Sequence, residues 1–160
     1  MPLVVRPAVL ADAEEIARVH IASWRETYTR LVPTGALDDL DVDARAERWS
    51  EIIGDERTAV CVAEHDGVVI GWASASPGRE VGAPRDLELE GIYVLAAEHG
   101  GGAGQALLDA AVGDRPAYLW SAADNPRAQA FYRRNGFVDD GTRSEHPLAG
   151  HPVEIARFVR

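Results

Sequence analysis

Lysine is absent from this sequence, and all 16 of its basic residues are arginine. The 26 aspartates and glutamates outnumber them, which gives a formal net charge of −10 at pH 7 and a pI near 4.9. Nucleic-acid binding depends on clustered cations that contact phosphates, so we expect no nucleic acid among the partners. The acidic residues between Asp38 and Asp66 would attract a positively charged amine substrate, but a solvated surface explains them more simply.

Cysteine and long apolar runs are also scarce. Cys61 is the only cysteine, so the chain cannot form an internal disulfide, and its apolar neighbours predict a buried thiol. No apolar run approaches the length needed to cross a bilayer, and the first residues, MPLVVRPAVL, have no signal-peptide pattern. The sequence therefore predicts a soluble cytoplasmic protein without a membrane partner. Its 160 residues fit a single domain over residues 1–160.

The spacing of apolar residues predicts a chain of strands and helices. Helical spacing occurs over residues 12–28, 43–53, 102–112 and 126–135, and Asp12, with Glu15 three residues later, is expected to cap the first helix. Extended runs occur over residues 3–8, 58–65, 68–78, 86–94, 117–122 and 153–159, with a further strand beginning at Phe137. Asp66 and Gly67 predict a hairpin, whereas helices connect other strands, so we expect a mixed α/β sheet.

A glycine-rich run follows the strand predicted at residues 86–94. Its sequence is HGGGAGQALL, residues 99–108. Glycines let the backbone approach a ligand closely, and the unpaired N–H groups and the dipole at the start of a helix favour an anion. The run therefore predicts a phosphate site, although a flexible turn without a ligand has the same composition. It is not a P-loop, because no Lys-Ser or Lys-Thr pair follows, and residue 105 is glutamine where a dinucleotide fingerprint needs glycine.

At these residues the chain resembles the GCN5-related N-acetyltransferase (GNAT) family. The run from His99 to Gly104 is similar to the acetyl-CoA signature Q/R-x-x-G-x-G/A of that family. Residues 124–137, DNPRAQAFYRRNGF, are similar to its second motif, N-x-x-A-x-x-F-Y-x-x-x-G-F. The N-terminal run HIASWRETYTRLVP extends the resemblance over nearly the whole chain. The resemblance implies a GNAT fold of the α+β class: a mixed, mostly antiparallel central sheet with a splayed strand pair, flanked by about four helices.

The resemblance also implies acetyl-CoA as the co-substrate, with no metal. In the family, the pantetheine arm pairs with the strand before the glycine run and contacts the helix that the second motif contains. The signature starts with Gln or Arg where this chain has His99, and the position of Gly101 is often basic, so backbone amides are expected to carry more of the binding. The residues implied for cofactor binding are Ile92, Tyr93, Val94, His99, Gly100, Gly101, Gly102, Ala103, Gly104, Gln105, Asn125, Ala128, Phe131 and Tyr132.

Residues 86–94 do not alternate as a regular half-buried strand would. Glu88 and Glu90 share their parity with apolar Ile92 and Val94. We therefore expect a bulge at Gly91, which would turn a backbone N–H toward the thioester carbonyl.

The acceptor amine must lose a proton before it attacks a thioester, because a simple alkylamine has a pKa of about 10. Glu90 and Glu88 are the candidate bases, directly or through water, and Tyr132 is the candidate acid that protonates the departing CoA thiolate. Each of the three is also explained without a catalytic role, the carboxylates as solvent-facing strand residues and the tyrosine as a packing residue. The aromatic residues that could line an acceptor pocket are Trp24, Tyr28 and Trp72.

Three classes of function are consistent with these features. The first is an N-acetyltransferase that acts on a small amine or a peptide N-terminus. The second is a non-catalytic acyl-CoA-binding module on the same fold. The third is a dinucleotide-dependent oxidoreductase, which the glycine spacing and the hairpin before the run argue against. The sequence does not determine the oligomeric state, and a homodimer is compatible with it.

Overall fold

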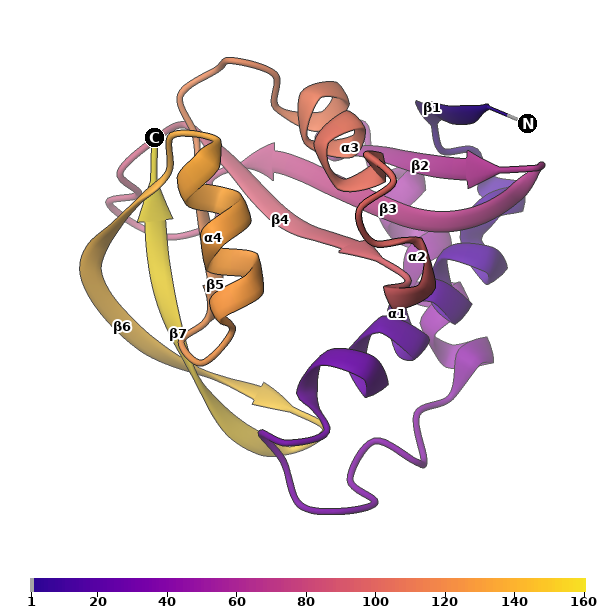
Figure 1. Cartoon of the computed structure of the whole chain (residues 1–160), viewed down its shortest axis with the longest axis horizontal. Coiled ribbons are helices and arrows are strands. Elements are labelled where there is room, and N and C mark those ends of the chain that lie inside the picture. Colours follow the sequence, from indigo (N-terminus) through magenta and orange to yellow (C-terminus); the bar gives the residue numbers. More distant parts are fainter. Residues whose placement is uncertain (1) are drawn as a thin grey trace.

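The computed structural model describes residues 2–160 and contains a seven-stranded sheet in the order β1-β2-β3-β4-β5-β7-β6 (Figure 1). The strands are β1 (Leu3–Pro7), β2 (Ala59–His65), β3 (Val68–Pro77), β4 (Leu87–Val94), β5 (Tyr118–Ala122), β6 (Val138–Leu148) and β7 (His151–Val159). β4 and β5 are parallel, and the other neighbouring pairs are antiparallel. The predicted mixed, mostly antiparallel sheet is confirmed.

Four α-helices cover the sheet: α1 (Ala13–Tyr28), α2 (Val42–Gly54), α3 (Ala103–Ala111) and α4 (Pro126–Arg134). Each begins and ends within one residue of its predicted bounds. Two short 3₁₀ helices, η1 (Leu10–Asp12) and η2 (Ala96–Glu98), precede α1 and the glycine run. Helices α1 and α2 pack against each other on one face of the sheet, and α3 packs against β1 to β4 on the other (Figure 1).

Strand alternation divides the buried side chains between these two faces. In β2, Cys61 and Ala63 belong to the core under α3, whereas Val62 belongs to the core under α1 and α2. Both faces of β3 are buried, which explains its nearly continuous run of apolar and small residues. The Cys61 thiol is buried as predicted, and burial raises its pKa to about 11.

The start of α1 differs from the prediction. The Asp12 carboxylate accepts hydrogen bonds from two guanidinium nitrogens of Arg6, each at 2.8 Å, and from the N–H of Val9 at 2.8 Å. It therefore closes the η1 turn and makes no capping bond to α1. The predicted capping box of Asp12 and Glu15 is wrong, because the arginine on β1 engages the carboxylate and Glu15 pairs with Arg18.

A third apolar cluster closes the end of the molecule where α1 ends. Val32 and Leu37, in the connection between α1 and α2, pack with Leu148 at the tip of the β6–β7 hairpin. Arg25 of α1 donates to the Leu37 carbonyl oxygen at 3.1 Å and so holds this connection in place. Within residues 2–160, no helix is long and apolar enough to cross a membrane.

Candidate active site

Strand β4 contains the predicted bulge. Gly91 lies opposite Ser74 of β3 and Leu89 lies opposite Ala75, so Glu90 is one extra residue in β4. The extra residue reverses the alternation: Ile92 and Val94 pack against the core under α3, whereas the Glu90 side chain reaches Ser76 on the other face. The parity conflict in the sequence is therefore resolved by the bulge.

The bulge also requires a glycine at position 91. A Cβ atom there would lie 2.8 Å from Cη2 of Trp72, which is closer than side chains approach one another. Trp72 is only 3% exposed and packs against the rings of His20, Trp49 and Tyr93. The structure thus places Trp72, a predicted acceptor-pocket residue, in the core beneath the bulge and not on an open wall.

Beyond the bulge, β4 and β5 separate. The ladder between them consists, in the described chain, of the pairs Glu88–Tyr118 and Leu89–Leu119. The β5-facing edge of β4 from Glu90 to Val94 is therefore without a strand partner, which confirms the predicted splayed pair. Such an edge accepts an extended, amide-containing chain by main-chain hydrogen bonding. We call this opening the β4–β5 split.

The glycine run forms the turn between η2 and α3. Gly100 and Gly102 have φ of +84° and +89°, a left-handed conformation that favours glycine. Across residues 2–160, none of the backbone N–H groups from Gly102 to Gln105 donates to a protein acceptor. A Cβ atom at Gly102 would meet nothing within 4 Å, so the space beside the turn is open. Free N–H groups at the positive end of a helix dipole suit a phosphate, and the residues present therefore fit a pyrophosphate.

The polar side chains of the same turn are bound within the protein. Nε2 of His99 lies 2.9 Å from the carbonyl oxygen of Val94. Nε2 of Gln105 donates to Asp109 and to Asn135, at 2.9 and 2.8 Å. These side chains hold the turn against β4 and α4, so the backbone amides from Gly102 to Gln105 are the groups left unpaired.

Helix α4 positions Asn125 and Tyr132 beside the split. Asn125 caps the helix, with its Oδ1 accepting from the N–H of Ala128 at 3.3 Å. Tyr132 is 8% exposed and packs against the rings of Phe137 and Phe158, and in the described chain its hydroxyl makes no hydrogen bond. Burial, and after it the nearby Tyr93 phenol, raise the pKa of Tyr132 above its ordinary value. The phenol therefore stays protonated, which is the form that can donate a proton.

Two further phenols lie on the β4 side. The hydroxyls of Tyr28 on α1 and Tyr93 on β4 are 2.9 Å apart, so one donates to the other. Burial raises the pKa of both phenols. Trp24, one turn before Tyr28, packs edge-on against His20 and lies under the Arg45 guanidinium. Among the predicted acceptor-pocket residues, Trp24 and Tyr28 are partly exposed, whereas Trp72 is buried. Trp24 and Tyr28 pack against the apolar cluster of Val32, Leu37 and Leu148.

The two candidate bases have different surroundings. Glu88 is 3% exposed, and its oxygens accept from the backbone N–H, Nε and Nη2 of Arg79 at 3.2, 3.1 and 2.6 Å and from the Tyr118 hydroxyl at 2.9 Å. Burial alone would raise the pKa of Glu88, but the bonds and charge of Arg79 outweigh it and hold that pKa below its usual range. Both oxygens of Glu88 thus already have hydrogen-bond donors within the protein.

Glu90 has fewer partners. Its Oε1 accepts from the Ser76 hydroxyl at 2.5 Å and lies 3.5 Å from Nε of Arg79. Its Oε2 makes no hydrogen bond to the residues that the structure describes. Of the two carboxylates, Glu90 is therefore the one that keeps an oxygen free for a ligand.

Sequence reasoning missed the donors Ser76, Arg79 and Tyr118. Ser76 could have been found from the sequence, because pairing of the two predicted strands places it opposite Glu88 on β4. Arg79 lies in the loop after β3, and nothing in the local sequence marks it. Tyr118 lies beside Glu88 only because the connection through α3 places β5 parallel to β4.

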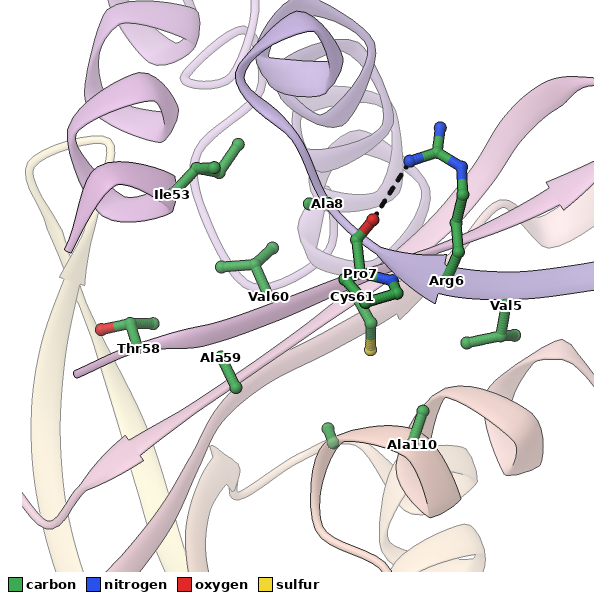
Figure 2. A pocket seen from close by; sticks show the side chains of 11 residues that line it. Val5, Arg6, Pro7, Ala8, Ile53, Thr58, Ala59, Val60, Cys61 and Ala110 are labelled. Carbon is green, nitrogen blue, oxygen red and sulfur yellow. Dashed lines mark hydrogen bonds between the residues drawn. The ribbon is translucent and has the colours of Figure 1, made fainter. Parts of the chain in front are cut away.

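A cavity of about 340 Å³ lies elsewhere, at the edge of the sheet where β1 ends (Figure 2). It lies between α2 and α3, and we call it the β1 notch. Small and apolar side chains, among them Ala8, Val60 and Ala110, line it, and no predicted site residue does. The only guanidinium in its lining, that of Arg6, is already bound to Asp12 and Glu64. The notch therefore offers no free charged group, and the Thr58 hydroxyl is the one oxygen-bearing side chain among its described lining residues.

Comparison with known proteins agrees with this site. The model of the acetyltransferase (GNAT) family matches residues 18–137. The chain is 32% identical over 149 residues to the uncharacterized N-acetyltransferase Rv2669 of Mycobacterium tuberculosis, a match that covers 89% of this chain and 93% of that protein.

Solved structures share the whole fold. The PaiA N-acetyltransferase of Thermoplasma acidophilum, in complex with coenzyme A, superposes with a TM-score of 0.78 at 19% identity and full coverage of both chains. YncA of Salmonella typhimurium, whose structure holds acetyl-CoA, superposes with a TM-score of 0.71 at 22% identity, covering 100% of this chain and 94% of that one. The split sheet, the glycine turn and the family match together show that the chain belongs to the GNAT family and is an acetyltransferase.

Proposed function

We propose that this enzyme transfers the acetyl group of acetyl-CoA to a primary amine, of a small molecule or a peptide N-terminus, in the cytoplasm. The observation that carries the proposal is the β4–β5 split, because unpaired groups of three kinds border it. The glycine turn supplies free N–H groups, β4 supplies the carboxylate of Glu90, and α4 supplies the phenol of Tyr132.

Acetyl-CoA binds along the split. Its pantetheine arm pairs with the free edge of β4 at residues 92–94, and its pyrophosphate binds the free amides of residues 102–105. Asn125, Ala128 and Phe131 of α4 form the opposite wall. Support comes from PaiA and YncA, which share the fold and hold coenzyme A and acetyl-CoA.

The acceptor arrives as an ammonium ion at the carboxylate side. Glu88, Arg79 and Glu90 carry two negative charges and one positive charge, so their sum is −1 and favours a cation. Glu90 takes the first proton from the nitrogen, directly or through water, and passes it to solvent before the neutral amine attacks the thioester carbon. A C–N bond forms, the C–S bond breaks, and the CoA sulfur leaves as a thiolate. The nitrogen loses its second proton to water as the neutral amide forms.

Tyr132 then protonates the thiolate. Its hydroxyl has no acceptor in the described part of the chain, so donation to sulfur breaks no existing bond. Glu90 is ionised again by this point, and the Tyr132 phenol recovers its proton from water, which restores both groups for the next turnover.

We expect the part of the acceptor molecule beyond its amine to lie next to Trp24 and Tyr28. Both lie at the end of α1, where the connection to α2 and the tip of the β6–β7 hairpin enclose the site. Trp72 contributes from below, by holding Gly91 and the bulge in position.

Thiol release from acetyl-CoA across a panel of amines, followed against pH, tests the proposal. We expect release with at least one amine, and a rate that rises about tenfold per pH unit while the free amine is mostly protonated and chemistry limits the rate. A rate independent of pH under those conditions would contradict direct attack by a free amine. Tight acetyl-CoA binding without thiol release for every amine would instead identify an acyl-CoA-binding module.

A further inference from the structure

Glu88 and Glu90 lie on the same face of β4 and share one arginine unequally. Arg79 makes three hydrogen bonds of 3.2 Å or less to Glu88 and a single contact of 3.5 Å to Glu90. Glu88 is enclosed, with 4% of its side chain exposed, whereas 18% of the Glu90 side chain is exposed. The guanidinium is therefore bound to the buried carboxylate and only adjacent to the accessible one.

This division matters because a full ion pair would disable a base. An arginine that bonds directly to a carboxylate stabilises its charged form and weakens it as a proton acceptor. Arg79 follows β3 in an exposed loop, and 62% of its side chain is exposed, so it has room to move to a new partner. Without Glu88, the nearest carboxylate for Arg79 is Glu90, 3.5 Å from its Nε.

We propose that Glu88 is a positioning residue that holds the Arg79 guanidinium away from Glu90 and so keeps Glu90 able to accept the proton of the acceptor amine. The inference rests on the proposed function, in which Glu90 is the base. It assigns different roles to two carboxylates that are two residues apart and of the same chemical type.

The other groups around this cluster are already engaged. Tyr118 donates to Glu88 from β5, and Ser76 donates to Glu90 from β3. Glu80, the next residue after Arg79, binds Trp120 and Arg157 at 3.3 Å each. Tyr93 on the same face is bonded to Tyr28. Arg79 is therefore the one cation among the described residues within salt-bridge distance of Glu90.

Three variants measured together test the proposal: Glu88→Gln, Arg79→Met and the double variant. Glu88→Gln should lower turnover about tenfold, less than the 10²–10⁴-fold loss that removal of a general base causes. The pH below which its rate falls faster than protonation of the amine explains should become lower, because Arg79 now pairs with Glu90. Arg79→Met should raise that pH, because two like charges remain together.

The double variant decides the question. It carries the same local charge as the parent, and glutamine still accepts from Tyr118, so turnover and the pH profile should return to within about threefold of the parent. A double variant as slow as Glu88→Gln would overturn the proposal, and so would a Glu88→Gln profile that does not shift. Melting temperatures of all three variants identify a loss caused by misfolding, and the opposite shifts of the two single variants cannot arise from misfolding.

Glu90→Gln separates this inference from the proposed function. If Glu90→Gln retains full activity, Glu90 is not the base and the proposed mechanism fails at that step. If Glu90→Gln is inactive but the double variant shows no recovery, the mechanism stands and the role assigned to Glu88 is wrong.

Discussion

The β4–β5 split and the β1 notch are both interruptions of the sheet, and they differ in the state of their polar groups. In the notch, the Arg6 guanidinium donates to Asp12, Glu64 and the Pro7 carbonyl oxygen, and the remaining lining is mostly apolar. In the split, the backbone N–H groups from Gly102 to Gln105, the Tyr132 hydroxyl and Oε2 of Glu90 have no partner among residues 2–160. We therefore expect the active site at the split, where polar groups are held in place yet unpaired. The volume of the notch does not by itself make it a catalytic site.

The two interruptions also have different causes. Strand β1 ends at Pro7, and after one more main-chain bond, from the Ala8 N–H to the Val60 carbonyl oxygen at 2.9 Å, the chain turns into η1. Small side chains such as Ala59 and Ala110 leave the notch unfilled. The split arises from an extra residue in β4 together with a parallel neighbour that diverges after Leu89. A bulge re-aims side chains and frees backbone groups, whereas the end of an edge strand does neither.

Removal of one hydroxyl in the split should have the largest effect. We expect Tyr132→Phe to lower turnover by about 10²–10⁴-fold, because it removes the proton donor for the thiolate and keeps the ring. Acetyl-CoA affinity and melting temperature should stay close to those of the parent, since the hydroxyl makes no hydrogen bond in the described chain. Turnover within a few-fold of the parent, with chemistry rate-limiting, would show that water protonates the thiolate.

A carboxylate placed in the glycine turn should have the next largest effect. Gly104→Asp should weaken acetyl-CoA binding by about 10- to 10²-fold, as expected when a charge-assisted hydrogen bond worth about 1.5–3 kcal/mol is lost. A Cβ atom at Gly104 meets only the Phe131 ring, at 3.8 Å, and an acidic residue suits the first turn of a helix, so folding should be retained.

Gly104→Asn is the matched control for the charge, because asparagine has nearly the same size. Calorimetry should show a smaller loss of affinity for Gly104→Asn than for Gly104→Asp. Equal affinities for the parent and both variants would mean that the pyrophosphate does not bind at this turn.

The notch should respond in stability and not in catalysis. Arg6→Met should lower the free energy of unfolding by about 1–3 kcal/mol, because it leaves the carboxylates of Asp12 and Glu64 without their cation. The KM for acetyl-CoA should not change. Denaturant titration and initial rates on the same samples measure both, and a raised KM would show that the two interruptions are coupled.

The pH dependence of that stability follows from Asp12. Hydrogen bonds from Arg6 lower the pKa of Asp12 in the folded protein. A lowered folded pKa contributes stability above the unfolded pKa of about 3.9, and this stability is lost as pH falls through the folded value. The parent should therefore lose stability more steeply below about pH 4 than Arg6→Met does. Parallel curves would show that Arg6 does not set the Asp12 pKa.

A filled notch should have the smallest effect. Ala110 is exposed at its rim, so Ala110→Leu adds apolar volume there without touching a site residue. We expect turnover to be unchanged and the free energy of unfolding to stay within about 0.5 kcal/mol of the parent. A clear loss of turnover would contradict the separation of the two regions.

The elements could be predicted from the sequence because each has a local cause. Apolar spacing marks the four helices, and Asp66 with Gly67, both at positive φ, forms the predicted hairpin turn. The bulge at Gly91 was predictable too, because its parity conflict lies within one strand. The Asp12 cap was predicted wrongly because Arg6, which takes its carboxylate, acts from another element.

By itself, the sequence determined the strand and helix order, the glycine turn that suits a phosphate, and the positions of the candidate acid and bases. These depend on backbone conformation and on spacing within single elements, where neighbours in the chain are neighbours in space. Only the tertiary structure decided that both oxygens of Glu88 have hydrogen-bond donors whereas one oxygen of Glu90 is free. The donors Arg79, Ser76 and Tyr118 come from a loop and two other strands. The accessibility of a carboxylate depends on which partners surround it, and those partners converge only once the sheet is assembled.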